Sequence, residues 1–579
     1  MEQKHLPYRQ LPYLIRHFFG RFFDSEVLAN LHTDMNVLVV HVLGLLVLPG
    51  LLKTWLSVTK YSYLAWFPVA GRDGALLIDS YFFLCVSMLL TGFITVFEWD
   101  TLFPDSKDYY NLSPLPIAPS VLFVAKVIAL SGFVLLFHTA INLIPTLLFP
   151  NLVLAASFKR GTAGWQIPSG ESLRYIAGHA LSLFLSTVFV FTSLITVNAV
   201  FLLALSARIL RIASRGAQLI VILVLVCASF SGSSADRLII EENGLIHWLP
   251  PFWFLGVYQV LIGHRSAINI SLAREAYAAV VVCSILSAVT YTISYQSSMR
   301  KGFQSAGLPS YPVTRLKSTW AWILHFAILR KPIERASFHF IAQTAFRRHE
   351  HLLYWGSFVA VGIALIYSDL HAIGSNPGLG LSQYLTSLLA AALILSFFLL
   401  IGLRFVFTVP ADLNANWVFK TIDEQILKMS YGGVRKFMLA AVMTPLLLLF
   451  GPCYLLVWDT RTVAGHVVYV SLLSLILIEL LLIRFMKLPF TCSYLPGKAG
   501  TILLWPVYVF VCYCYCYGMA FLEKWVLRGI GRFLVFVILA GVAFWVLRKQ
   551  HVQFLNGKGT IRFEEERADE TIVLSIEGQ

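Results

Sequence analysis

Ionisable side chains inside long apolar stretches are the first candidates for chemistry in this sequence. A charged group is costly in hydrocarbon, so a carboxylate or amine there faces protein or water and often serves transport. Glu479 and Lys126 lie in such stretches, and each is either a polar contact within a helix bundle or part of a translocation pathway. Four histidines lie in apolar runs as well: His41, His138, His179 and His466. For these we expect a neutral ring that is hydrogen-bonded within the bundle.

Sequence motifs for hydrolysis do not occur in this chain. An ATPase needs the loop G-x-x-x-x-G-K-[ST], which neither the run GKAG at 497–500 nor the run GKG at 557–559 fits. His349 and His351 have the wrong spacing for a zinc-binding H-E-x-x-H helix, and there is no G-x-S-x-G elbow. The eight cysteines form no C-x-x-C pair. We therefore expect no enzymatic activity, no cofactor and no metal site in this chain.

A short polar segment follows the apolar run that ends at Phe97. It combines carboxylates, an aromatic residue and prolines: Glu98, Trp99, Asp100, Asp105, Asp108, Pro114 and Pro116. Such a segment can form a short helix and turn whose charges and rings dock a partner protein. A plain solvated connector is the alternative interpretation.

The composition determines what surrounds these residues. The chain has 579 residues, of which 58% are hydrophobic and 13% charged, and its mean hydropathy is +0.75. A water-soluble fold of this size would have too little polar surface to cover itself. Apolar stretches of about 20 residues recur from Met35 to Val546, long enough to cross a hydrocarbon core as helices. The sequence predicts an all-α polytopic membrane protein, and the continuous apolar runs do not fit the alternating strands of a barrel.

We predict twelve transmembrane helices in two sets of six. The first set lies near 35–53, 75–97, 120–149, 173–203, 217–232 and 275–294. The second set lies near 351–370, 384–408, 434–457, 463–486, 501–522 and 529–547. These sets define the domains: an interfacial segment 1–34, a first unit 35–294, a linker 295–350, a second unit 351–547 and an acidic tail 548–579.

Basic residues predict the orientation. The formal charge of +14 comes from Lys and Arg in the loops, above all in the linker 295–350, so we expect membrane topology and not nucleic-acid binding to explain it. With the linker in the cytoplasm, both termini are cytoplasmic and the protein belongs in the plasma membrane. The basic loop that holds Glu523 then lies outside, against its charge. Residues 11–28 mix Phe with Arg and suit a helix in the interface plane, or an ordinary cytoplasmic tail.

The two halves share a local pattern, because each second span ends in a proline followed by a carboxylate. These residues are Pro104 and Asp105 in the first half and Pro410 and Asp412 in the second. Internal repeats are the usual plan of transport proteins. The pattern around them, WDTLFPD and LSPLP in residues 99–116 and PADLNANWVF in residues 410–419, resembles ABC-2-type permeases, the membrane subunits of type V ABC transporters. The bacterial version in question has two six-helix units fused in one chain.

The resemblance implies a function and a set of docking residues. In that family the loop between the second and third helices carries a coupling helix that rests on a separate ATP-binding subunit, present in two copies. Residues 98–116 and 410–420 would inherit this role, including in the second loop Pro410, Asp412, Asn414, Asn416 and Trp417. A re-entrant hairpin is a further family feature, and residues 236–263 resemble it because two prolines interrupt an apolar run. No segment of comparable length precedes the twelfth helix.

The expected function is that of an exporter permease for an unidentified substrate, which could be amphipathic or lipidic. ATP would be hydrolysed in the partner subunit, and the lipid bilayer is the other partner. The alternatives are an ATP-independent carrier or channel that uses Glu479 and Lys126, and a membrane scaffold that recruits partners.

Overall fold

A computed structural model describes residues 6–22, 35–64, 69–103, 112, 114–115, 117–158, 169–230, 244–301, 329–374, 381–483, 485, 487–492 and 505–557. These residues are almost wholly helical, and no β-strand forms among them. The chain divides into two compact units, Met1–Ser310 and Tyr311–Gln579. Within the described ranges, ten helices are long and apolar enough to cross a membrane. The predicted all-α polytopic membrane fold is thereby confirmed.

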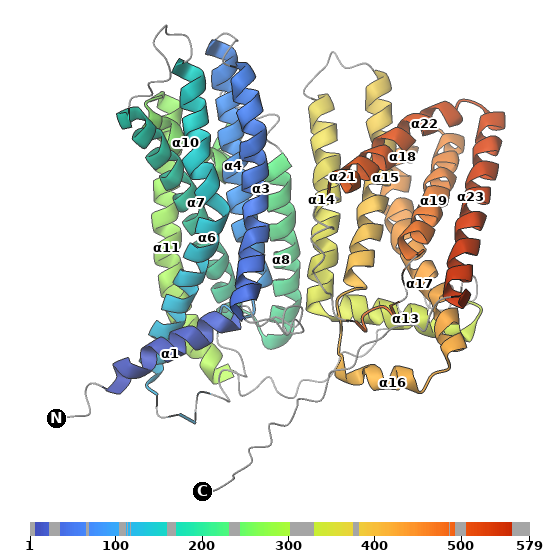
Figure 1. The fold of residues 1–579 in the computed structure, drawn as a ribbon, viewed down its shortest axis with the longest axis horizontal. Coiled ribbons are helices and arrows are strands. Elements are labelled where there is room, and N and C mark those ends of the chain that lie inside the picture. The colour runs from blue at the N-terminus through green and yellow to red at the C-terminus, as the bar shows by residue number, and fades with distance from the viewer. Residues whose placement is uncertain are drawn as a thin grey trace, which may run out of the picture. The chain divides into compact units, whose positions relative to one another are not determined.

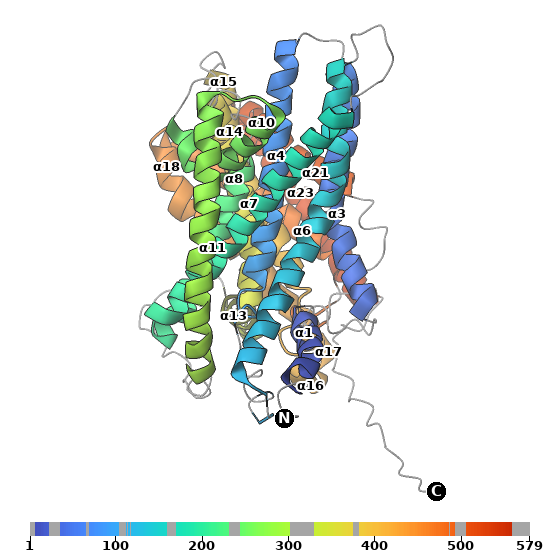
Figure 2. The same cartoon turned by 90° about the vertical axis from the view of Figure 1, so that its left-hand side faces the viewer.

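The first unit is a bundle of long helices with a short helix across one end (Figures 1 and 2). The short helix is α1 (Leu6–Arg21), and it packs on α6. The long helices are α3 (Met35–Leu64), α4 (Val69–Phe97), α6 (Pro119–Phe158), α7 (Ser169–Ala204), α8 (Ala207–Phe230) and α11 (Ala267–Lys301). Each predicted span of the first set coincides with one of them.

Small residues bring α3 and α6 together. A Cβ atom on Gly50 would lie 2.8 Å from Pro145 Cγ, so a larger residue does not fit there. Thr54 and Ser57 are buried on the same face of α3, one and two turns further on. Helices in lipid associate through such small residues because apolar side chains alone gain little from leaving lipid.

A broken helix occupies the place of the expected re-entrant segment. A 3₁₀ turn, η2 (Gly244–Trp248), leads into α10 (Pro250–Ile262), which Pro250 starts and Gly263 ends with a φ of 108°. With 13 residues, α10 spans only about 20 Å and is too short to cross a membrane. It packs on α4, α7 and α11. Residues 236–243 of the predicted hairpin lie outside the described ranges.

The second unit contains the other set of long helices (Figure 1). Its elements are α13 (Pro332–Arg347), α14 (His349–Gly374), α15 (Leu381–Val406), α16 (Trp417–Lys420), α17 (Glu424–Pro445), α18 (Gly451–Leu455), α19 (Thr460–Leu482), α21 (Trp505–Tyr513), α22 (Met519–Val526) and α23 (Ile530–Gly557). Two π-helical turns join α17 to α18 and α21 to α22: η4 (Leu446–Phe450) and η5 (Cys514–Gly518).

The structure differs from the predicted domain limits at the linker and at the tail. Part of the predicted linker 295–350 is the helix α13, which begins at Pro332 and buries Phe338, Ile341 and Ala345 on one face. This spacing of three and four residues is that of an amphipathic helix. Part of the predicted tail is helical as well, because α23 continues to Gly557.

Candidate functional site: connecting turns and buried charges

The turn that follows α4 is tied to two other helices of unit 1. The Trp99 carbonyl accepts a hydrogen bond from Asn198 Nδ2 of α7 at 2.9 Å. The Leu102 carbonyl accepts one from the Tyr291 hydroxyl of α11 at 3.0 Å. Both bonds are buried, so water does not compete for them, and they hold the turn rigidly on the bundle.

The predicted docking residues of this first turn divide into two kinds. Trp99 is 2% exposed and points into unit 1, so it positions the turn and cannot itself contact a partner. Asp100 and Pro114 are exposed, and Glu98 is half-buried. The remaining predicted residues, Asp105, Asp108 and Pro116, lie outside the described ranges.

The turn that follows α15 is tied to the segment after α19. The Phe490 amide donates to the Phe407 carbonyl at 3.1 Å, and the Ala411 amide donates to the Phe490 carbonyl at 2.9 Å. Asn416 Nδ2 donates to the Thr491 carbonyl at 2.9 Å. The second turn is therefore held by three hydrogen bonds to one short stretch of chain.

The docking residues predicted for this second turn also divide. Pro410 and Asn416 are buried and position the turn. Asp412 is exposed, and Trp417 at the start of α16 is 61% exposed. Asn414 begins the short 3₁₀ turn that precedes α16. Of the side chains that the structure describes in this group, Asp412 and Trp417 are those that a partner protein could contact.

Lys126 packs against the short helix α1 of unit 1. Its side chain is buried on α6, and the ammonium lies 4.9 Å from the ring centre of Phe18 and 5.2 Å from that of Phe22. Both rings belong to α1 or directly follow it, so the contact fixes α1 on α6. In unit 2, Lys436 of α17 pairs with Glu334 of α13. The third long helix of each unit thus contacts a short helix of that unit, α1 or α13, through a lysine.

Glu479 lies in a buried charged cluster of unit 2. Its carboxylate, on α19, lies 2.8 Å from Arg435 Nε of α17, and the side chain is fully buried. His551 Nδ1 of α23 is 3.3 Å from Arg435 Nη2 and 3.4 Å from Glu479 Oε2. The guanidinium can only donate, so this ring nitrogen is the acceptor in its contact with Arg435. The cluster joins three helices, as a polar bundle contact would.

A second buried acid, which the sequence did not predict, also contacts α19. Glu523 of α22 lies 2.6 Å from His466 Nδ1 of α19, and both side chains are fully buried. The predicted topology placed Glu523 in an outer loop, against the basic residues around it, but the helix continues to Val526 and turns Glu523 inward with Ala520. The spacing of Ala520, Glu523 and Val526 along one helix face was the available signal.

The other histidines have differing surroundings. His138 Nδ1 lies 2.9 Å from Thr187 Oγ1, within a neutral network that also contains Ser87 and Asn142, as expected for a bundle contact. His179 is ringed by Phe83, Phe149 and Tyr258, and neither ring nitrogen has a hydrogen-bond partner among the described residues. The side chain of His41 lies outside the described ranges.

A further cluster that the sequence did not reveal joins α3 to α4. Asp79 is fully buried and contacts both Lys53 and Lys60. Lys60 lies beyond the predicted end of the first span at residue 53, so the predicted helix did not bring it near Asp79. The available signal was the interval of seven residues between the lysines, which places them on one side of a helix.

No group of three or more His, Cys, Asp or Glu side chains that could hold a metal ion occurs in the described part of the chain. A cavity of about 280 Å³ lies where α10 meets α11, lined by Leu76, Leu77, Gln259, His264, Ser266, Ile268 and Asn269.

Comparisons with protein families, with curated proteins and with solved structures found no match to this chain.

Proposed function

We propose that this chain is the membrane permease subunit of an ABC-type exporter, driven by a separate ATP-binding subunit. In this proposal α3 and the helical run from α21 to α22 join the ten long apolar helices as spans. The total is then twelve, six in each unit, with the interface helices α1 and α13 at the cytoplasmic ends. The proposed substrate is amphipathic or lipidic.

One repeated arrangement supports this proposal. In unit 1 the turn after the second long helix is hydrogen-bonded to the fourth, through Trp99 and Asn198. In unit 2 the equivalent turn is bonded to the segment that follows the fourth, through Asn416 and Thr491. A partner that pushes on such a turn moves a membrane helix with it, because the buried hydrogen bonds couple the turn rigidly to that helix or to the segment after it. Exposed Asp412 and Trp417 offer the contact.

An ion-coupled carrier is the second candidate. It is favoured by one observation, that α19 carries two buried acid and histidine contacts, Glu479 with His551 and His466 with Glu523. Buried ionisable groups in membrane helices often relay protons. The Glu479 carboxylate is, however, already paired with Arg435 at 2.8 Å, as in a structural contact between helices.

A pull-down from the native host tests the first proposal. Tagged full-length protein is solubilised in mild detergent, and co-purifying ATP-binding subunits are quantified by mass spectrometry together with the ATPase activity of the eluate. We expect an ABC ATPase with the wild type and at least about a tenfold loss with Trp417→Ala, as for a central interface tryptophan. The matched control is Trp248→Ala, which removes an 82% exposed tryptophan from η2 of unit 1, away from both predicted docking turns.

The opposite result would favour the carrier. If no nucleotide-binding subunit accompanies the wild type even after crosslinking, the permease proposal fails. Proton-driven uptake into vesicles would then be compared between the wild type and Glu523→Gln.

A further inference from the structure

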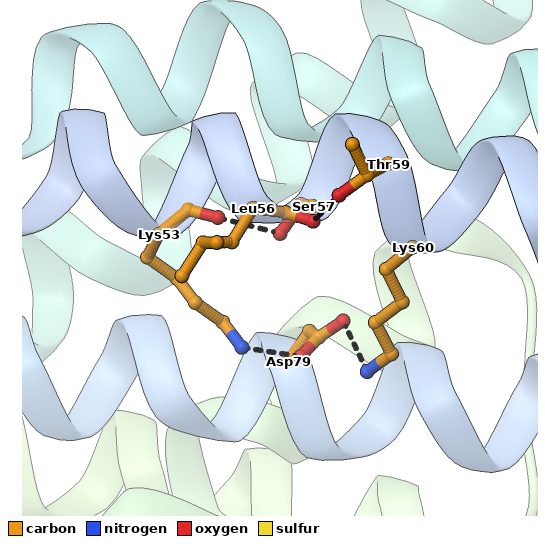
Figure 3. A network of polar contacts seen from close by, with 6 residues as sticks. All are labelled: Lys53, Leu56, Ser57, Thr59, Lys60 and Asp79. Atoms are coloured by element: carbon orange, nitrogen blue, oxygen red, sulfur yellow. Dashed lines mark hydrogen bonds and ion pairs between the residues drawn. The ribbon is translucent and has the colours of Figure 1, made fainter.

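Two lysines of α3 share one carboxylate of α4 (Figure 3). Lys53 Nζ lies 2.8 Å from Asp79 Oδ1, and Lys60 Nζ lies 2.8 Å from Asp79 Oδ2. Asp79 is fully buried, whereas 23% of the Lys53 side chain and 38% of the Lys60 side chain are exposed. Among the described residues one carboxylate contacts both ammonium groups, so the three side chains together carry one net positive charge.

The lysines lie at the edge of a lipid-facing surface. Lys53 and Lys60 are seven residues apart and therefore lie on one side of α3, next to the face that packs on α6. On their other flank α3 presents exposed apolar side chains, a surface that faces lipid in a membrane helix. This apolar stripe consists of Leu48, Leu51, Leu52, Trp55 and Leu56.

The position along α3 corresponds to the headgroup region. With 30 residues, α3 is about 45 Å long and exceeds a hydrocarbon core of about 30 Å. Lys60 is four residues from the end of the helix at Leu64, and this end of unit 1 is the one away from α1. Lys53 lies two turns deeper, and its long side chain reaches up to Asp79.

We propose that the cluster of Lys53, Lys60 and Asp79 binds the phosphate of an anionic phospholipid in the leaflet at this end of unit 1. Each ammonium has three donors, and the contact with Asp79 uses one of them, so donors remain for phosphate oxygens. A single negative headgroup neutralises the remaining charge, and low polarity nearby strengthens the attraction. The acyl chains then lie along the apolar stripe. This inference requires membrane residence only and is independent of the ATPase proposal.

The test measures lipid binding to the full-length protein by native mass spectrometry. We expect the wild type to retain phosphatidylglycerol in preference to phosphatidylcholine. Lys60→Met removes the excess charge but leaves Asp79 paired with Lys53, and we expect about a fivefold loss of phosphatidylglycerol affinity. Asp79→Asn raises the net charge and should leave that affinity unchanged or higher. Lys60→Met therefore lowers the affinity whereas Asp79→Asn does not, a difference that a general folding defect would not produce.

Two further variants show whether lipid binding depends on the charge of this cluster. Lys60→Arg keeps the charge and should bind as the wild type does, while Lys428→Met removes a paired lysine from α17 and should have no effect. The proposal is overturned if phosphatidylcholine binds equally well, or if Lys60→Met keeps the wild-type preference. It is also overturned as a lipid site if inorganic phosphate at equal concentration displaces phosphatidylglycerol.

Discussion

A neutral network in unit 1 and a buried ion pair in unit 2 connect their helices through different kinds of polar contact. In unit 1 the central contacts among α4, α6 and α7 are neutral, with His138 and Asn142 bonded to hydroxyl groups. In unit 2 a buried ion pair joins two helices, with Glu479 of α19 against Arg435 of α17. A lost neutral hydrogen bond leaves dipoles that find other partners, whereas a lost countercharge leaves an ion in a medium that cannot solvate it. We therefore expect a substitution in the neutral network to reduce stability less than a substitution that removes one partner of the ion pair.

The largest effect should come from Glu479→Leu in unit 2. It leaves the Arg435 guanidinium, which is 14% exposed, without its carboxylate, and we expect a loss of about 3–5 kcal/mol of stability. Thermal unfolding of the purified protein in detergent, followed by tryptophan fluorescence, measures this loss. The double variant Arg435→Met/Glu479→Leu should recover most of it, and a double variant as unstable as the single one would contradict the charge argument.

The short helices α1 and α13 should differ less in the stability that each loses on substitution. Phe18→Leu keeps an apolar side chain but removes a ring face from the buried Lys126 ammonium, and we expect α1 to be destabilised by about 2 kcal/mol. The matched change on α13 is Phe338→Leu, which loses only an edge contact with Phe437, at about 1 kcal/mol. Limited trypsin digestion measures how often each helix detaches. Equal digestion of the two variants would show that the Lys126 contact adds nothing.

Asn142→Leu in unit 1 should have a modest effect. Ser87 and His138 both remain bonded to Thr187 when the Asn142 amide is removed, so we expect a loss of about 0.6–1 kcal/mol. The same fluorescence assay compares this variant with Glu479→Leu. A loss as large as that of the Glu479 variant would remove the distinction between the two interiors.

The smallest effect concerns the start of α19 outside the membrane. Hydrogen bonds from Thr462, first from its hydroxyl, lower the pKa of the exposed Asp459 carboxyl that caps this helix. A lowered pKa in the folded state means that the cap stabilises the helix above the ordinary carboxyl pKa of about 3.9 and is lost as the pH falls. Unfolding midpoints of the wild type and Asp459→Ala should therefore differ at pH 6 and converge near pH 3. A difference that does not change with pH would contradict this role.

The sequence predicted the long helices well because continuous apolar length is a strong signal. It missed α13, whose 16 residues alternate polar and apolar side chains and never form an apolar run. The length of an apolar run also could not predict the π-helical turns η4 and η5, because these turns have the same apolar composition as the helices around them.

Predictions for single side chains depended on contacts between distant segments. Trp99 was expected to be exposed and is buried, because Asn198, 99 residues further along the chain, holds its backbone inside unit 1. For Glu479 the sequence left two alternatives, a bundle contact and a pathway residue, because its partners Arg435 and His551 lie on other helices. The composition of a segment predicts that its residues lie in the membrane, but the contact partners of a side chain depend on how the helices pack.

The Lys53, Lys60 and Asp79 contacts also have a consequence for biogenesis. A charged residue at the centre of a helix that enters the bilayer alone costs about 2.5–3.5 kcal/mol, and Lys53, which lies two turns deeper in α3 than Lys60, has its carboxylate partner on α4. We expect the translocon to hold α3 until α4 has been synthesised, so that the two helices enter the bilayer together as a hairpin with the carboxylate already in place. Ribosome-bound chains that end before Asp79 should then leave α3 poorly inserted, and chains that include α4 should insert both.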